Sequence, residues 1–390
     1  MGTVMKFDAV IVGGGIIGCT HAYYLSLKGL KVAVIEKGAV GGGTTARNFS
    51  WINATWKTAN PDYYRLSATS VKMYSALADE FGADALGLSP IGAIGITRKS
   101  EQVNYQALSK QSMLLAEFGY PSQWLDTAKL RTCEPNIQFS NDTEGLLSST
   151  DKTLNAVHFT RFIADRVRAT GGVVMENCAA IEIEADDDGA VTGLVAAKGH
   201  FATDRIIIAA GPETPKALSD LTGYDGFAAR FPVNKVPGLL VTTPPVPKGL
   251  VRHLMYTDDG GEFHFMPDFN GGLRLASDDT DGAIIEDQSP EHLRSLAIGL
   301  LRRMQGFVPE FGGEALINDC DIRVGIRAYP EDGFSIAGTL PAAKGLYVIA
   351  THSGITLAPV LGKLMAKVVV EGFVPKMLAP FGLERLPGFS

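Results

Sequence analysis

The sequence predicts an α/β protein with one domain built on a parallel sheet and a second, α+β domain built on a mixed antiparallel sheet. A βαβ pattern opens the chain between Phe7 and Glu36. Nearly continuous apolar runs, typical of strands buried on both faces of a parallel sheet, recur at residues 205–210 and 346–350. Between these runs, from Phe231 to Arg327, alternating strands are separated by Asp/Gly turns.

Composition and charge are those of a globular protein that acts on small molecules. Of the 390 residues, 46% are hydrophobic and 20% charged, and the net charge of -7 without a Lys/Arg block argues against nucleic acid as a partner. The four cysteines form no C-x-x-C pair, so we expect neither a metal site nor a disulfide framework. The chain enters its first strand at once and has no run of membrane-spanning length, so we expect a cytoplasmic protein without a transmembrane segment.

The opening strand, Phe7 to Val12, leads directly into Gly13, Gly15 and Gly18, which form a G-x-G-x-x-G turn. In such a turn the first glycine lets the chain reverse, the second lets the backbone approach a pyrophosphate, and the third lets the helix pack on the strand. A glycine turn alone would also suit tight packing. Here the strand, turn, helix, second strand and acid follow at the spacing of a dinucleotide-binding, Rossmann-like unit.

The helix after the turn is predicted from Ile16 to Lys28, with its N-terminal amides facing the phosphates, and Gly29 ends it. The second strand, Lys31 to Ile35, is followed by Glu36. A carboxylate about 20 residues after the glycine turn accepts hydrogen bonds from ribose hydroxyls. An acid at this place disfavours a 2′-phosphate.

The segment GAVGGGTTARNFSWINA, from Gly38 to Ala54, is too rich in Gly, Thr and Ser for a regular element and too apolar near its end for a solvated linker. We expect it to lie against a bound molecule; the alternative is an ordinary surface loop with one buried Trp. Its GGGTTARNFSWI run resembles the second flavin-contacting loop of the D-amino acid oxidase, glycine oxidase and sarcosine oxidase family. The resemblance implies contacts with FAD from Thr44, Thr45, Arg47 and Asn48, with Ser50 and Trp51 nearer the isoalloxazine ring.

The middle of the chain mixes helices and strands. Periodicity predicts helices at residues 61–81 and 101–118 with a strand at 92–97 between them. A helix at 156–170 and a strand at 173–176 then return the chain to the nucleotide-binding domain, and in the family the backbone just after this strand pairs with adenine. We therefore predict an FAD-binding domain of residues 1–54, 152–224 and 338–390, and a substrate-binding domain of residues 55–151 and 225–337.

The segment ATHSGITLAPVLG follows the strand at residues 346–350 and resembles the C-terminal motif of the same family, where a helix start faces the pyrimidine edge of FAD. A helix N-terminus stabilises the negative charge that reduction places on that edge. Thr356 is a good N-cap, and Pro359 is tolerated in a first turn. We place Gly354 to Thr356 at the flavin; the alternative is an ordinary capped helix.

The segment RVGIRAYPEDGFSIAG resembles the family pattern G-x-R-P-x-x-x-D-G, whose arginine binds the substrate carboxylate, and Arg327 falls on that position. A guanidinium presents two parallel donors and so fixes the orientation of a carboxylate as well as binding it. Ala328 stands where the family often has proline. The alternative is a structural arginine paired with a nearby acid such as Asp332.

Two further positions depart from the family. In FHFMP, His264 stands where family members often have a tyrosine that holds the carboxylate or closes the pocket, so it is either a polar ligand or a packing residue. Arg274 stands where sarcosine-oxidase-type members have a lysine that assists oxygen activation, which weakens the case for fast reaction with oxygen. The cysteine of covalent family members aligns near Gly325 and not at Cys320, so we expect non-covalent FAD.

The resemblance extends over essentially the whole chain and implies hydride transfer from the C–N bond of an amino acid or N-substituted amino acid to flavin N5, giving an imine that hydrolyses. We expect a substrate with a carboxylate, oxygen or a quinone as electron acceptor, and a homo-oligomer or oxidase complex. One alternative is a 2-hydroxy acid dehydrogenase, with His264 or His352 as base; the other is a flavin-carrying subunit of a larger complex. The full set of predicted FAD contacts is Gly13, Gly15, Ile16, Ile17, Gly18, Glu36, Lys37, Thr44, Thr45, Arg47, Asn48, Ser50, Trp51, Ala180, Ala210, Gly211, Arg327, Ser353, Gly354, Ile355 and Thr356, and the predicted catalytic residues are Arg327, His264, Arg274 and His352.

Overall fold

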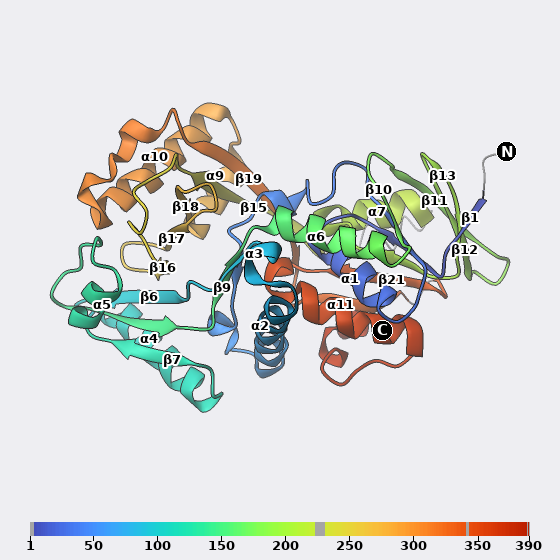
Figure 1. The fold of residues 1–390 in the computed structure, drawn as a ribbon, viewed down its shortest axis with the longest axis horizontal. Helices are drawn as coiled ribbons and strands as arrows, with labels where there is room; N and C mark the ends of the chain where they lie inside the picture. The colour runs from blue at the N-terminus through green and yellow to red at the C-terminus, as the bar shows by residue number, and fades with distance from the viewer. Residues whose placement is uncertain (1–3, 223–230, 341–342, 388, 390) are drawn as a thin grey trace.

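A six-stranded sheet forms the centre of the first domain in the computed structural model, which describes residues 4–222, 231–340, 343–387 and 389 (Figure 1). Five strands run parallel, and the edge strand β20 is antiparallel to its neighbour. The apolar run at residues 205–210 contains β14, which lies inside this sheet as predicted. In spatial order the strands are β10 (Val173–Met175), β3 (Val32–Ile35), β2 (Ala9–Val12), β14 (Ile206–Ile208), β21 (Leu346–Ala350) and β20 (Ile336–Thr339).

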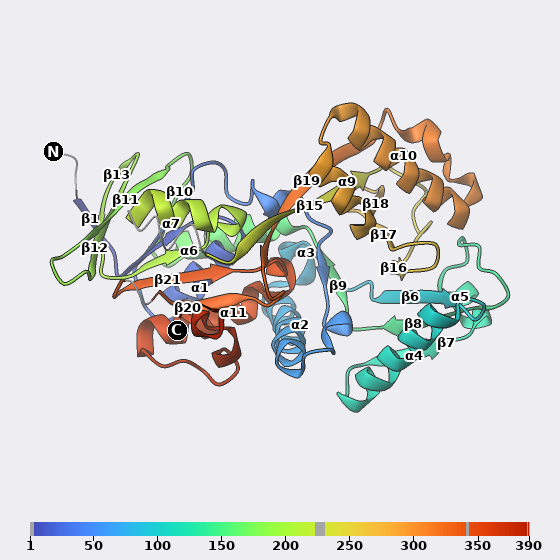
Figure 2. The same cartoon turned by 180° about the vertical axis from the view of Figure 1, so that it is seen from behind.

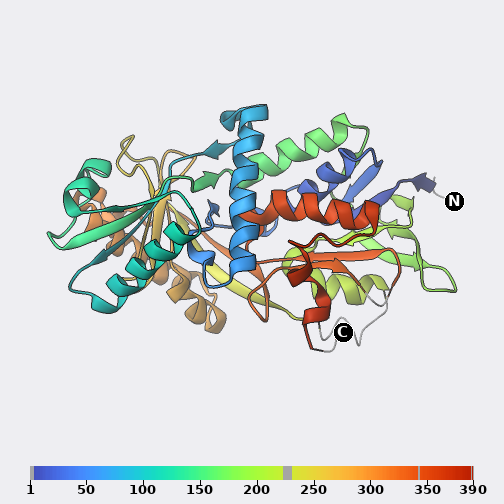
Figure 3. The ribbon, with the colours of Figure 1, turned by 90° about the horizontal axis from the view of Figure 1, so that it is seen from below.

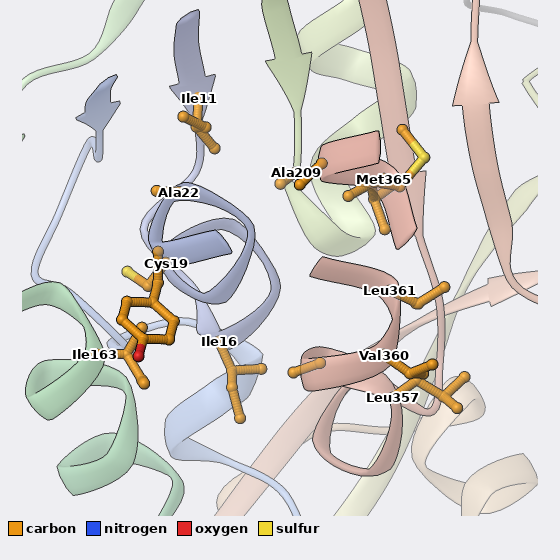
Figure 4. Close-up of a cluster of buried hydrophobic side chains, with 14 of the residues drawn as sticks. Ile11, Ile16, Cys19, Ala22, Ile163, Ala209, Leu357, Val360, Leu361 and Met365 are labelled. Carbon is orange, nitrogen blue, oxygen red and sulfur yellow. The ribbon is translucent and has the colours of Figure 1, made fainter. Parts of the chain in front are cut away.

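Helices cover one face of this sheet. Successive strand residues point to opposite faces, so Ile11 packs toward the helices while Val10 packs toward the other side. Figure 4 shows Ile16 of the first helix and Leu357 of the last helix among the buried side chains of this core. The covering helices are α1 (Ile16–Ser26), α6 (Ala156–Ala169) and α11 (Gly354–Glu371).

The opposite face of the parallel sheet packs against α7 (Thr214–Thr222) and a four-stranded sheet (Figure 2). The domain therefore has three layers. The strands of this second sheet, in spatial order, are β1 (Val4–Lys6), β13 (Gly199–Ala202), β12 (Val191–Ala196) and β11 (Ala180–Ala185).

An eight-stranded mixed sheet forms the second domain, as predicted. Only the pairing of β16 with β6 is parallel. Helices α5 (Thr127–Cys133) and α10 (Pro290–Phe307) pack on one face, and α4 (Gln102–Glu117) packs on the other. In spatial order the strands are β19 (Asp321–Pro330), β15 (Val233–Thr242), β18 (Leu273–Ala276), β17 (Phe263–Pro267), β16 (Leu254–Thr257), β6 (Ala93–Arg98), β8 (Thr143–Ser148) and β7 (Ser122–Leu125).

Three connections join the domains. Strands β15 and β19 pair along all 10 residues of each strand and extend from one domain toward the other (Figure 1). A small sheet of β4 (Trp51–Ile52), β9 (Lys152–Leu154) and β5 (Leu88–Ser89) lies between them. Helix α2 (Pro61–Phe81) stands at the junction (Figure 3). The short helices α3 (Ala83–Leu86) and α9 (Asp281–Glu286) complete the set of α-helices among the described residues.

The packing differs from the predicted domain boundaries in two places. Residue 338 falls inside β20, which belongs to the parallel sheet. Helix α2 was predicted in the second domain, but its Tyr63, Leu66 and Tyr74 pack in the hydrophobic core that contains α11. Its apolar stripe is buried by a helix that is distant in the sequence. No helix within the described ranges is long and apolar enough to span a membrane.

The prediction of Thr356 as the N-cap of the last helix is wrong. Helix α11 begins at Gly354, and Ser353 occupies the N-cap position without a side-chain hydrogen bond to the helix. The Thr356 hydroxyl instead donates to the Trp51 carbonyl at 3.1 Å and accepts from the Asn53 amide at 3.3 Å. Pro359 consequently lies inside the helix and not in its first turn. Contacts with the loop around Trp51 take the hydroxyl that a cap would use.

Candidate active site

The glycine turn contains two glycines that packing requires and one that it does not. A side chain on Gly13, where φ is +114°, would overlap the Ala209 carbonyl, and one on Gly18 would overlap the Gly13 carbonyl. Both positions require glycine for packing alone. A Cβ on Gly15 would meet only the Thr45 hydroxyl, at 3.4 Å. Gly15 is also the N-cap of α1 without a side-chain cap, so the turn is open beside the helix N-terminus.

Glu36 is held beside this turn by main-chain amides. One carboxylate oxygen accepts from Gly14 N and the other from Gly38 N, both at 2.7 Å. The amide of Cys178 donates to the Glu36 carbonyl at 2.8 Å, which brings the start of β11 at Ala180 close to the same point. Lys37, by contrast, is exposed.

The loop that contains the GGGTTARNFSWI run contacts both domains. The Thr45 hydroxyl accepts from the Ile16 amide at 3.1 Å, and the Thr44 hydroxyl donates to the Ile326 carbonyl on β19 at 2.6 Å. A side chain on Gly325 would overlap the Arg47 carbonyl, so the loop and β19 touch through their backbones. The Arg47 guanidinium is exposed and donates to Gly42 within the same loop.

Two helix N-termini meet near this loop. A Cβ on Gly354 of α11 would lie 3.5 Å from the Ile17 side chain of α1. The carbonyl of Ile355 accepts from the Tyr74 hydroxyl at 2.5 Å, which ties α11 to α2. Ala210 and Gly211 follow β14 and continue into a 3₁₀ turn (Gly211–Glu213). The carboxyl ends of β2, β14 and β21 thus bring together predicted residues that are far apart in the sequence.

Arg327 extends from β19 toward two acids. Its Nη1 lies 3.1 Å from Asp278 Oδ1, and its Nη2 donates to Asp281 and to the Pro237 carbonyl. The Nε atom is buried and has no partner among the described residues. Burial raises the pKa of Asp281 to about 6 against the opposing effect of Arg327. Arg327 is thus paired with nearby acids, as the alternative interpretation expected, but Asp332 is not one of them, because that carboxylate is 2.8 Å from Arg385 Nε.

His352 is a neutral imidazole at neutral pH. Burial, together with the charges of Lys57 and Arg327, lowers its pKa to about 4. The ring stacks on Tyr329 at 4.4 Å between centroids, with Nε2 3.0 Å from the Gly333 carbonyl. Since Nε2 must carry the proton donated to that carbonyl, Nδ1 accepts from the Ser353 hydroxyl at 3.1 Å. Both ring nitrogens are therefore engaged.

His264 and Arg274 do not join this cluster. His264 packs among aromatic rings, with Tyr256 at 4.7 Å and Trp51 at 6.0 Å, and its Nε2 is 2.9 Å from the Glu262 carboxylate. Arg274 forms an ion pair with Asp268 and donates to Ser50 Oγ at 3.2 Å and to the Asn48 carbonyl at 3.3 Å. On β15, Arg274 pairs with Thr242 while Arg327 pairs with Val236, so the two arginines lie about 20 Å apart along the strands.

Sequence reasoning missed a buried carboxylate behind Trp51. Asp151 accepts from Trp51 Nε1 at 2.9 Å, from the Tyr120 hydroxyl at 2.6 Å and from the Thr55 hydroxyl at 3.1 Å. Burial raises its pKa to about 7, against these hydrogen bonds. Sequence reasoning also missed Lys57, Asp278 and Asp281. Of these three, only Lys57 could have been noticed in the sequence, as a cation between Trp56 and Tyr63 just after the loop.

Comparisons with known proteins agree over the full length of the chain. A family model described as "DAO: FAD dependent oxidoreductase" matches residues 8–368. A glycine oxidase of Geobacillus kaustophilus (strain HTA426) is 26% identical over 388 residues, which are 97% of each chain. Sarcosine oxidase subunit beta of Rhizobium meliloti (strain 1021) is 24% identical and covers 97% of this chain and 88% of its own. The crystal structure of glycine oxidase from Geobacillus kaustophilus superposes with a TM-score of 0.80 at 24% identity, covering 99% of this chain and 100% of that one.

Replacing Gly325 by alanine should displace the loop and weaken FAD binding. The new Cβ would overlap the Arg47 carbonyl, and two backbones cannot separate without moving Thr44 from Ile326. We expect about 1–3 kcal/mol of destabilisation, the usual cost of overpacking, and a higher Kd for FAD. Thermal unfolding and FAD titration of the apoprotein measure both. Gly299→Ala on α10, where a Cβ meets nothing within 4 Å, is the matched control and should not lower stability. Normal FAD binding by Gly325→Ala would contradict the prediction.

Asp151 should make the protein less stable as the pH rises. Its folded-state pKa, about 7, lies above the usual value of 3.8, so the folded protein holds the proton more tightly than the unfolded chain. Its stabilising contribution is complete below pH 4 and is lost as the pH rises through about 7, with a slope of at most about 1.4 kcal/mol per pH unit. Urea unfolding from pH 4.5 to 8 should show this slope in the parent and not in Asp151→Asn. A surface variant, Asp220→Asn, should keep it; equal slopes in the parent and Asp151→Asn would refute the assignment.

Proposed function

Because the chain belongs to the DAO family of FAD-dependent oxidoreductases, we propose that it oxidises the carbon–nitrogen bond of an amino acid or N-substituted amino acid. The relatives named above are a glycine oxidase and a subunit of a sarcosine oxidase, and both names refer to small amino acids. The observation that carries the proposal is Arg327, a cation with one buried donor unpaired among the described residues, on the strand whose Tyr329 stacks on His352 just before α11. A carboxylate held there would lie next to the flavin site.

The residues present fit FAD. Neither α1 nor α11 has an N-cap side chain bonded to it; Thr45 accepts from the Ile16 amide of α1, and the positive end of each helix dipole faces this site. We propose that the Gly13 to Gly18 turn holds the pyrophosphate, that Glu36 holds the ribose, and that the loop from Thr44 to Trp51 with Ser353 to Thr356 holds the flavin. When bound, FAD supplies the two-electron acceptor for the oxidation. A cysteine at Gly325 would overlap the Arg47 backbone, which supports non-covalent binding.

Arg327 is suited to orient a substrate because its own orientation is fixed. Asp278, Asp281 and the Pro237 carbonyl hold Nη1 and Nη2. The buried Nε is left to donate, and a substrate carboxylate would bind along that edge of the guanidinium. The carboxylate then determines how the α-carbon meets the flavin. Positioning the substrate in this way contributes as much to the rate as the binding affinity does.

The state of His352 favours amine oxidation over oxidation of a 2-hydroxy acid. A hydroxyl substrate needs a base, but the pKa of His352 is lowered to about 4 and both of its nitrogens have partners. An amine loses its proton to solvent and then carries its own lone pair. No protein base is required at the carbon. Activity should therefore rise with pH through the ionisation of the substrate amine.

The experiment that tests the function is anaerobic mixing of the holoenzyme with a panel of amino acids and N-methylated amino acids. Loss of the flavin absorbance with at least one compound, and ammonia or amine as product, is the expected result. Admission of air or of a quinone then identifies the electron acceptor. Bleaching by 2-hydroxy acids alone would favour the dehydrogenase alternative. No bleaching by any compound would favour the non-catalytic subunit, an alternative supported by the match to a sarcosine oxidase subunit.

Substituting Arg327 should impair both binding and turnover. With Arg327→Ala we expect KM to rise and kcat to fall together, with kcat/KM lower by about 100-fold or more, because the anchor also sets geometry. Arg327→Lys should restore little, since an ammonium lacks the two-donor fork. Arg302→Ala removes an exposed ion pair with Glu314 and is the control. An unchanged kcat/KM in Arg327→Ala would dispose of this role.

A further inference from the structure

Lys57 is the cation of the candidate site whose charge has no partner. It ends a 3₁₀ turn (Thr55–Lys57) that directly follows the flavin loop. Its Nζ lies over the Tyr63 ring, 5.4 Å from the centroid. Among the described residues the structure shows no hydrogen bond and no ion pair to this nitrogen, although the side chain is half-buried. Burial lowers the pKa of Lys57, and Asp278 opposes that change.

Lys57 is half-buried as a residue, and its ammonium has no hydrogen-bond acceptor or ion-pair partner among the described residues. Charged side chains taken out of water are almost always paired, because desolvation of a lone charge costs more than the chain can otherwise recover. The Tyr63 ring face replaces only part of the lost hydration. The Lys57 ammonium is therefore available to bind an anion.

No acid within the described ranges forms an ion pair with Lys57, and Asp278 acts on it only without a direct contact. Asp278, the acid that acts on Lys57, is bonded to Arg327 at 3.1 Å, and Asp281 is bonded to Arg327 as well. The Tyr63 ring under Lys57 lies 6.4 Å from the His352 ring, and His352 stacks on Tyr329, which follows Arg327 on β19, so both cations lie near His352. Arg327 forms ion pairs with two carboxylates, whereas Lys57 forms an ion pair with none of the described residues.

We propose that Lys57 binds a second anionic group of the substrate, which is therefore an amino acid with two carboxylates. Arg327 takes the carboxylate next to the oxidised carbon, and Lys57 takes a carboxylate carried either on the side chain or on a substituent of the nitrogen. Lys57 is a specificity-determining residue in this arrangement and takes no part in the bond changes. The inference rests on the proposed function for its substrate class, but the anion site can be tested without turnover.

The test compares matched ligands on the holoenzyme. Malonate and acetate are titrated against the flavin absorbance, as non-oxidisable ligands with two carboxylates and one. Iminodiacetate and sarcosine are compared by kcat/KM, since they differ only in a carboxymethyl group against a methyl group on the same amine; aspartate and alanine form the matching pair for a side-chain carboxylate. The variants are Lys57→Gln, Lys57→Met and Lys57→Arg. Lys28→Met, which removes an exposed ion pair with Glu371, is the control.

We expect Lys57→Gln and Lys57→Met to weaken malonate binding, and to lower kcat/KM for the preferred dicarboxylate, by about 10- to 100-fold, the usual effect of losing a hydrogen bond to a charged group. Acetate, sarcosine and alanine should change by no more than a few-fold, and Lys57→Arg should retain the preference. Equal losses for one-carboxylate and two-carboxylate ligands, or no loss for either, would overturn the proposal. If no amino acid reduces the flavin, the proposed function fails, while the malonate and acetate titrations still decide whether Lys57 binds a second anion.

Discussion

The arrangement of the site depends on one constraint, the contact of the loop from Gly38 to Ala54 with main-chain atoms of both domains. Thr45 joins the loop to the first amide of α1, and Thr44 joins it to β19. Gly325 lets the two backbones touch. These contacts use short hydroxyl side chains, which have few rotamers, and a glycine, which has no side chain to keep the two backbones apart. The nucleotide-binding turn and the sheet that carries Arg327 therefore keep a defined relation to each other.

Electrostatic compensation differs sharply among the polar groups of the site. Arg327 has two acids, His352 is neutral because it is buried beside cations, and Lys57 has no partner among the described residues. Two carboxylates face the Arg327 guanidinium, and Asp281, whose pKa is raised to about 6 by burial, carries only part of its charge near that pH. In the proposed function, what the site recognises depends on which cation each anionic group of the substrate reaches.

His264 and Arg274, which were predicted as catalytic residues, contact the loop in the structure. Arg274 lies under the loop, where it supports Asn48 and Ser50, and Ser50 adopts a positive φ of 66°. A charge at that place fixes the loop that the flavin is proposed to contact. His264 supports the same segment through Trp51 and Phe49. We interpret both as residues that position the loop. Their effect on the substrate would act through it.

The sequence by itself determined what is local: the glycine turn, the apolar strands, the acid after β3 and the glycine-rich loop. Local spacing suffices there because each feature is a property of neighbouring residues, and the family resemblance rests on the same short motifs. Tertiary structure decided the rest. The prediction of Thr356 as a cap failed because its hydroxyl bonds to Trp51, which lies 305 residues away in the chain, and no local pattern reveals that contact. Likewise, Arg327 forms ion pairs with Asp278 and Asp281 and not with Asp332, and Lys57 has no ion pair among the described residues. The pairing of charges depends on which strands and turns meet in space.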